Sequence, residues 1–99
     1  MGLRLTWDEA KRRANLEKHG LDLADAEGVL ASRYRLDVPV VRNGEARVQS
    51  ISYVLEALAV LTVVHVPREG LTRVVSFRRA GTAEREIYRV WLEDQHHDP

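Results

Sequence analysis

With 99 residues, of which 44% are hydrophobic and 30% are charged, the chain has the size and balance of one globular domain over residues 1–99, which excludes a disordered or fibrous protein. It has no cysteine, no signal-peptide pattern and no apolar run long enough to cross a membrane. We therefore expect a cytoplasmic protein without disulfides, thiolate metal sites or membrane contact. The formal net charge is zero, with 15 basic and 15 acidic residues, and this total by itself argues against a nucleic-acid partner.

Two helices are predicted in the first third of the chain. Asp8 is placed to cap the first, over about Glu9–His19, and Gly20 is placed to end it in a left-handed turn. This helix has few apolar residues, so we expect it to lie on the surface. After Asp22, apolar residues recur at helical spacing and predict a second helix over about Leu23–Ala31.

Four strands are predicted next, over about Tyr34–Val38, Arg47–Val54, Leu58–Val66 and Leu71–Arg78. Pro39 makes the first an edge strand or ends it, because proline cannot donate a ladder hydrogen bond. Asn43-Gly44 is a hairpin signal, and the residues from Pro67 to Gly70 supply the turn before the fourth strand. The third stretch is almost continuously β-branched, which predicts a central strand covered on both faces.

A last helix is predicted from Thr82. Its apolar face, which we expect to pack on the sheet, is formed by Ala83, Ile87, Val90 and Trp91. The order of the elements predicts an α+β fold with two N-terminal helices, a four-stranded antiparallel sheet and a C-terminal helix. Residues 95–99 are polar and are expected to form a frayed tail.

Metal-dependent and conventional hydrolase chemistry find no support in the sequence. Four histidines are present, but none has a partner at a metal-ligand spacing, and His96-His97 falls in the tail. There is no glycine-rich phosphate loop and no nucleophile elbow of a Ser-His-Asp enzyme. We therefore expect neither a metal nor a cofactor.

Basic residues instead gather at the predicted ends of elements. Arg78-Arg79 closes the fourth strand, Arg68 lies in the turn before it, and Lys18-His19 closes the first helix. We expect these residues to meet in one pocket and to hold an RNA phosphodiester. Thirteen of the 15 basic residues are arginine, whose planar group binds phosphate in a bidentate way. The alternative is that this richness reflects only genomic base composition.

In such a pocket the ribose 2′-hydroxyl could attack its own phosphate without a metal, given a base, an acid and cations. Arginine supplies only the cations, because its pKa exceeds about 12. His19 is one candidate proton carrier, and the alternative is that it only caps the helix. Glu84 and Tyr88 either face the sheet edge or flank the core. Trp7 and His65 are interpreted as core residues rather than RNA contacts.

Two motifs near the ends of the chain resemble those of a known family. The first is Trp7-Asp8-x-x-Lys11-x-x-x-Asn15-x-x-Lys18-His19-Gly20, and the second is Val75-Ser76-Phe77-Arg78-Arg79-Ala80 followed by Glu84-Arg85-x-x-Tyr88. Together they resemble the opening and closing motifs of BrnT toxins. The resemblance extends over about Leu5 to Tyr88.

The resemblance implies a RelE-like fold and a toxin of a type II toxin–antitoxin system, a metal-independent endoribonuclease that inhibits translation. The partners it implies are RNA and a BrnA-like ribbon-helix-helix antitoxin, with DNA bound only through the complex that represses its own operon. With His19 included as a candidate proton carrier, the predicted catalytic residues are Lys18, His19, Arg68, Arg78, Arg79, Glu84 and Tyr88. The predicted RNA-binding residues are Arg47, Arg73 and Arg85.

Departures from the family pattern leave other interpretations open. Phe77 stands where alanine is usual, Gly81 replaces a Ser or Thr helix cap, and Ser52 and Leu23 replace a usual glycine and phenylalanine. Phe77 adjoins the predicted site and is expected to narrow it. The alternatives are a weakened toxin that only binds its antitoxin and represses the operon, and a small scaffold domain unrelated to RNA.

Overall fold

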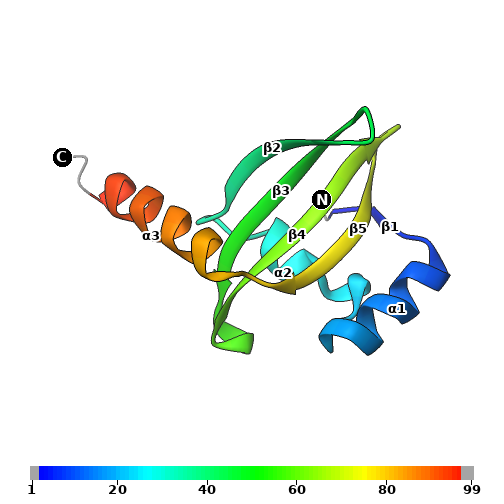
Figure 1. Ribbon diagram of the computed structural model, residues 1–99, viewed down its shortest axis with the longest axis horizontal. Helices are drawn as coiled ribbons and strands as arrows, with labels where there is room; N and C mark the ends of the chain where they lie inside the picture. The colour runs from blue at the N-terminus through cyan, green and yellow to red at the C-terminus, as the bar shows by residue number, and fades with distance from the viewer. Residues whose placement is uncertain (1–2, 97–99) are drawn as a thin grey trace.

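A twisted sheet forms the centre of the protein (Figure 1). The computed structural model describes residues 3–96, and in this range the sheet has five strands in the order β1-β5-β4-β3-β2. The strands are β1 (Leu5–Thr6), β2 (Leu36–Arg42), β3 (Glu45–Val54), β4 (Ala59–Arg68) and β5 (Leu71–Arg79). The helices are α1 (Glu9–His19), α2 (Glu27–Leu30) and α3 (Thr82–His96), with 3-10 turns η1 (Leu23–Asp25) and η2 (Leu55–Ala57). The predicted α+β class is confirmed, and every helix in the described range is too short or too polar to cross a membrane.

The prediction of four antiparallel strands is wrong, because β1 adds a fifth strand that runs parallel to β5. The two residues of β1 pair with Thr72 and Arg73, and the backbone N–H of Thr72 donates to the carbonyl of Arg4 at 2.9 Å. The other neighbouring strands are antiparallel, as predicted. A strand of two residues shows no alternation, so the sequence pattern could not reveal it.

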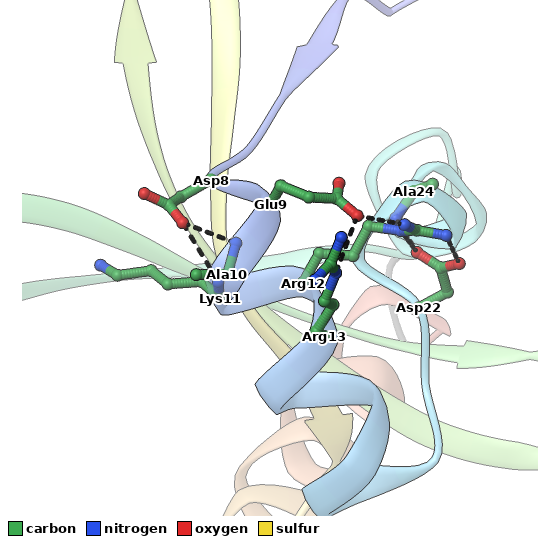
Figure 2. Close-up of polar contacts among 8 residues, drawn as sticks. All are labelled: Asp8, Glu9, Ala10, Lys11, Arg12, Arg13, Asp22 and Ala24. Carbon is green, nitrogen blue, oxygen red and sulfur yellow. Dashed lines mark hydrogen bonds and ion pairs between the residues drawn. The ribbon is translucent and has the colours of Figure 1, made fainter.

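The predicted boundaries of α1 are confirmed, and Figure 2 shows how its start is fixed. One carboxylate oxygen of Asp8 accepts hydrogen bonds from the backbone N–H groups of Ala10 at 2.8 Å and Lys11 at 3.2 Å. Gly20 ends the helix in the left-handed conformation, with a φ of 72°. Both ends therefore follow from local signals that the sequence displays directly.

Arg12 joins α1 to the turn that follows it (Figure 2). Its guanidinium donates to both carboxylate oxygens of Asp22, at 2.8 and 2.9 Å, and to Glu9 at 2.7 Å. Arg13 lies 3.6 Å from the same Glu9 carboxylate. Two basic residues near the start of the chain are thus already paired with acids.

The predicted helix over Leu23–Ala31 is wrong in its hydrogen bonding, because the segment forms η1 and then the single turn of α2. Asp22 accepts from the backbone N–H of Ala24 at 2.9 Å and its own carbonyl accepts from Asp25 at 2.8 Å, which closes a tight 3-10 turn. The predicted apolar face is nevertheless buried, and it consists of Leu23, Ala26, Val29 and Leu30.

Two prolines lie within strands rather than at their ends. β2 continues through Pro39 at the edge of the sheet, the position where a strand tolerates a missing N–H. β4 is central as predicted, but it is not covered on both faces, because Val64 lines an open groove. It continues through Pro67, so the predicted turn shortens to Glu69 and Gly70 with φ values of 48° and 82°. The hairpin predicted at Asn43-Gly44 is confirmed, with φ values of 52° and 76°.

One face of the sheet, the covered face, packs against α1, η1 and α2. The main core lies there and includes Leu23, Val29, Leu61, Val63, Val74 and Phe77, with Trp7 packed against it as predicted. Asn15 fastens α1 to β5: its side-chain amide donates to the carbonyl of Phe77 at 2.8 Å, and its side-chain oxygen accepts from the N–H of Phe77 at 3.1 Å. Because α1 has few apolar residues, the hydrogen bonds of the buried Asn15 help to hold this surface helix against the sheet.

The opposite face, the open face, packs against α3 as far as Leu92, and the end of that helix projects beyond the sheet (Figure 1). The helix packs on the sheet as predicted and Trp91 belongs to its packed face, but the prediction is wrong for Ile87 and Val90, which are 53% and 46% exposed. A second cluster forms instead from Tyr88, Trp91 and Leu92 with strand residues including Ile51 and Leu36. The helix extends to His96, so Gln95 is not frayed as predicted, and residues 97–99 of the predicted tail lie outside the described residues.

Candidate functional site

A groove of about 460 Å³ runs over the open face of the sheet. Side chains alternate along a strand, so Arg47 and Gln49 of β3 both point into it. Strand β5 contributes Ser76 and Arg78 to this groove and, at an irregularity in its pairing, Val75. We call it the arginine groove, and it is lined by Val40, Val41, Arg42, Arg47, Gln49, Val64, Val75, Ser76, Arg78 and Glu84. Valines and small polar side chains line it together, and its charged groups come from four different elements.

One end of the arginine groove is closed by an ion pair between Arg78 at the end of β5 and Glu84 in the first turn of α3. Nη1 and Nη2 of Arg78 donate to the two carboxylate oxygens of Glu84 at 2.9 and 2.8 Å. The two side chains are only 33% and 22% exposed. A bidentate pair with this much shielding holds the guanidinium in one orientation.

Glu84 accepts two further hydrogen bonds, from the side-chain amide of Gln49 at 2.6 Å and from the backbone N–H of Gly81 at 2.8 Å. The hydrogen bonds from Arg78 are the main reason why the pKa of Glu84 falls to about 2, and partial burial opposes them only in part. Glu84 is therefore a carboxylate at neutral pH, with four donors on its two oxygens. A group in this state neither donates a proton nor accepts one readily near neutrality.

The other end of the open face carries a second ion-pair cluster. Glu45 accepts from Nε of Arg47 at 2.9 Å and from Nη2 of Arg68 at 3.1 Å. The hydrogen bond from Arg47 is the main cause of the lowered pKa of Glu45, and the positive charges of Arg47, Arg68 and Arg73 contribute to it. Five arginines therefore share this face with two glutamates, namely Arg42, Arg47, Arg68, Arg73 and Arg78. Although the net charge of the chain is zero, this face of the sheet is therefore basic.

The structure brings together five of the residues predicted to form the site, which are Arg47, Arg68, Arg73, Arg78 and Glu84. It does not bring Arg79 into the groove, because strand alternation sends this side chain to the covered face, on the same side as Phe77. Lys18 and His19 end α1, which is fastened to the covered face through Asn15. The expectation of one pocket holding Lys18, Arg78 and Arg79 is therefore wrong.

Tyr88 and Arg85 also lie outside the groove. Tyr88 is 4% exposed, and its hydroxyl donates to the carbonyl of Tyr34 at 2.8 Å and accepts from the N–H of Tyr53 at 3.2 Å. Of the two placements left open for Tyr88, the structure shows the one that flanks the core, and the predicted catalytic residue therefore lies away from the groove. Arg85 donates to the carbonyl of Ala80 at 3.0 Å, which ties the start of α3 to the end of β5.

The family departures do not reach the arginine groove. Phe77 is 2% exposed in the core of the covered face, so it does not narrow the site as expected. Gly81 lacks a capping side chain, but its N–H is satisfied by Glu84, which reaches back from the first turn. Neither change disturbs the five arginines.

A Ser, His and Asp cluster forms near the edge of the covered face, which the sequence analysis did not detect. Ser50 donates to a carboxylate oxygen of Asp37 at 2.6 Å, and its hydroxyl lies 2.8 Å from Nε2 of His65. Because the hydroxyl hydrogen is used on Asp37, Nε2 must donate, so His65 does not act as a base toward Ser50. Burial lowers the pKa of His65, which is 9% exposed. His65 is thus a cross-strand core residue, as interpreted, and only the strand register could have revealed the cluster.

Potential metal ligands do not cluster in the part of the chain that the structure describes: over residues 3–96, no three His, Asp or Glu side chains come close enough together to hold an ion. In the arginine groove, Arg78 is paired with Glu84, and Arg47 is paired with Glu45 on the same face of the sheet. The chemistry that this surface can offer is recognition and stabilisation of negative charge by guanidinium groups.

A comparison with protein families agrees with the motifs at the two ends of the chain. The model of the family described as "Ribonuclease toxin, BrnT, of type II toxin-antitoxin system" matches residues 7–84. This range includes α1, the whole sheet except β1, and Glu84 in the first turn of α3. A comparison with curated proteins finds no match. Because the family match covers most of the chain, the protein belongs to the BrnT family of ribonuclease toxins of type II toxin–antitoxin systems.

Proposed function

We propose that the arginine groove binds RNA and that this toxin cuts RNA there as an endoribonuclease. The observation that carries the proposal is the gathering of five arginines from β2, β3, β4 and β5 on one face of the sheet. The phosphates of RNA attract such a surface, and the short side chains between the arginines, valines and Ser76, leave room for a strand to lie against it. Two pockets beside the covered face are lined by the acidic residues Asp25, Glu27 and Glu56 rather than by arginines, so they would repel phosphate.

The reaction needs no metal. The ribose 2′-oxygen attacks the adjacent phosphorus, its proton passes to a base, and the bond from phosphorus to the 5′-oxygen breaks as that oxygen receives a proton. The products are a 2′,3′-cyclic phosphate and a free 5′-hydroxyl. Arginines such as Arg78 stabilise the charge that develops on the phosphorus oxygens, and partial shielding from water strengthens this effect. The loss of intact messenger RNA then inhibits translation.

The partner of this toxin is an antitoxin, as the type II class implies. We propose a BrnA-like ribbon-helix-helix protein that covers the arginine groove with an acidic or helical stretch and carries the complex to operator DNA. RNA and the antitoxin would then exclude each other. We expect the association rate to fall as salt rises, and a rate independent of salt would remove the electrostatic part of this proposal.

The decisive experiment measures RNA cleavage by the purified protein in EDTA. We expect cleavage by the wild type and a strong loss in the double variant Arg42→Ala, Arg47→Ala, because both residues line the groove. Arg89→Ala is a control, since Arg89 lies on the exposed part of α3 and its ion pairs among residues 3–96 are with Glu86 and Glu93 of the same helix. Intact RNA at high protein concentration would contradict the nuclease proposal.

Growth of cells that express the chain alone separates an active toxin from a weakened one. We expect growth arrest on induction and rescue by the groove variant. A folded wild-type protein that leaves growth unchanged would favour the weakened toxin, which only binds its antitoxin and represses the operon.

A further inference from the structure

Arg78 has two edges that can make bidentate hydrogen bonds, and only one of them is used. Nη1 and Nη2 donate to Glu84 at 2.9 and 2.8 Å, and Nη1 also donates to the carbonyl of Arg79 at 3.2 Å. Among the described residues, no acceptor takes a hydrogen bond from Nε or from the second hydrogen of Nη2. The Nε–Nη2 edge is therefore open, and such an edge matches two oxygens of a phosphate.

Glu84 is fixed from sides other than that of Arg78. The N–H of Gly81 holds one carboxylate oxygen at 2.8 Å, and the amide of Gln49 holds the other at 2.6 Å. Gln49 in turn donates to the hydroxyl of Thr62, which is fully buried in β4. The carboxylate is thus anchored to the start of α3 and to two strands. It therefore fixes the plane of the guanidinium that it binds.

We propose that Glu84 is a positioning residue, which holds Arg78 by the Nη1–Nη2 edge and leaves the Nε–Nη2 edge to bind a phosphate of RNA in the arginine groove. The inference rests on the proposed function, because it requires RNA in the groove. It gives Glu84 a role different from the catalytic one that the resemblance to BrnT motifs implies. Arg78 contacts the substrate, and Glu84 acts through Arg78.

Two other roles for Glu84 predict different results. In the first role, Glu84 would be a mask, that is, a carboxylate that competes with RNA phosphate for the guanidinium of Arg78. Removal of its charge would then strengthen RNA binding. A proton carrier would leave binding unchanged, and its removal would abolish one limb of the pH profile of cleavage. Four hydrogen bonds on the carboxylate and its lowered pKa oppose the second role.

The test compares the affinities of the wild type, Glu84→Gln and Glu86→Gln for a short single-stranded RNA with 2′-O-methyl groups, which cannot be cut by its own 2′-oxygen. Glu86→Gln is the matched control, because it removes the same charge two residues away, where Glu86 is 60% exposed and pairs with Arg89. We expect Glu84→Gln to bind this RNA about tenfold more weakly than Glu86→Gln, since Arg78 loses its fixed orientation. Cleavage of unmodified RNA should fall while the shape of its pH profile is unchanged.

Each other outcome overturns the inference. Tighter binding by Glu84→Gln than by Glu86→Gln would identify Glu84 as a mask. Equal binding would exclude positioning, and the loss of one limb of the pH profile would then identify a proton carrier. An RNA that binds none of the three folded proteins would overturn the proposed function as well, which distinguishes that failure from failure of the inference alone.

A second variant controls for the possibility that Glu84→Gln weakens RNA binding by loosening the start of α3. Arg78→Lys keeps the charge but loses the planar fork, so it cannot pair with Glu84 and grip a phosphate at once. We expect Arg78→Lys to weaken RNA binding to a similar degree, and the double variant to bind no more weakly than either single variant. Losses that multiply in the double variant would show that Glu84 acts independently of Arg78. Thermal unfolding of each variant checks that the fold is retained.

Discussion

The covered face and the open face of the sheet are built from the same strands and have opposite characters. The covered face buries apolar side chains, and its polar residues, such as Asn15 and Ser50, have their partners within the fold. The open face carries arginines, of which Arg47, Arg68 and Arg78 are paired with glutamates but remain partly exposed. Adjacent residues of β5 illustrate the difference, because Phe77 enters the core while Arg78 lines the groove. Of two adjacent residues on one strand, the first thus contributes to stability and the second belongs to the candidate site.

The largest effect is expected from Phe77→Ala on the covered face. Removal of this buried ring should lower the free energy of unfolding by about 3–5 kcal/mol, through lost burial and a residual cavity. Denaturant unfolding measures the change. RNA affinity at a temperature where the variant is folded should stay near that of the wild type. A loss of RNA affinity in the folded variant would contradict the assignment of RNA binding to the open face alone.

Asn15→Ala should destabilise the protein by about 2–3 kcal/mol, because it leaves the buried N–H of Phe77 without its acceptor and frees α1 from β5. Urea unfolding provides the measurement. Glu17→Ala on the exposed side of the same helix is the control and should change stability little. Equal effects of the two variants would mean that Asn15 does not hold the helix.

Acid should weaken the open face through Glu84. Its pKa is about 2 in the folded protein against an ordinary value of 4.5, so its ion pair contributes stability that is complete above pH 4.5 and is lost as the pH falls toward 2. The free energy of unfolding of Glu84→Gln should therefore decline less over this interval than that of the wild type. Thermal unfolding from pH 5 to pH 2 checks this expectation. Parallel curves for the two proteins would contradict it.

The smallest effect is expected in the salt dependence of RNA binding. Arg47→Ala should reduce the slope of log affinity against log salt by about 0.7, the contribution of one phosphate contact to a single strand. Arg13→Ala should leave the slope unchanged, because Arg13 lies on α1, which packs on the covered face. Fluorescence anisotropy over a range of salt concentrations gives both slopes. A reduced slope for Arg13→Ala would place RNA on both faces.

The parts of the fold that the sequence predicts well are those with local signals. The ends of α1 follow from Asp8 and Gly20, and the hairpin follows from Asn43-Gly44. The parts it misses depend on distant pairing: β1 exists only through two residues of β5, and the buried face of α3 is set by the hydroxyl contacts of Tyr88.

The candidate site shows the same limit. Clustering of arginines in the sequence predicted a basic site, and several of its members do meet on the open face. The sequence could not exclude Arg79 or Lys18, because their facing depends on strand register and on the Asn15 contact. The full set of hydrogen bonds on the Glu84 carboxylate includes one from Gln49, a residue 35 positions away in the chain, which the sequence could not reveal.

The most direct test of the central claim compares Arg78→Ala with Arg79→Ala, two changes of equal charge at neighbouring positions on opposite faces. If RNA is cut in the arginine groove, kcat/KM for RNA cleavage should fall by about 10²- to 10³-fold in Arg78→Ala and by less than about threefold in Arg79→Ala. Equal losses in the two variants, or a greater loss in Arg79→Ala, would contradict the account.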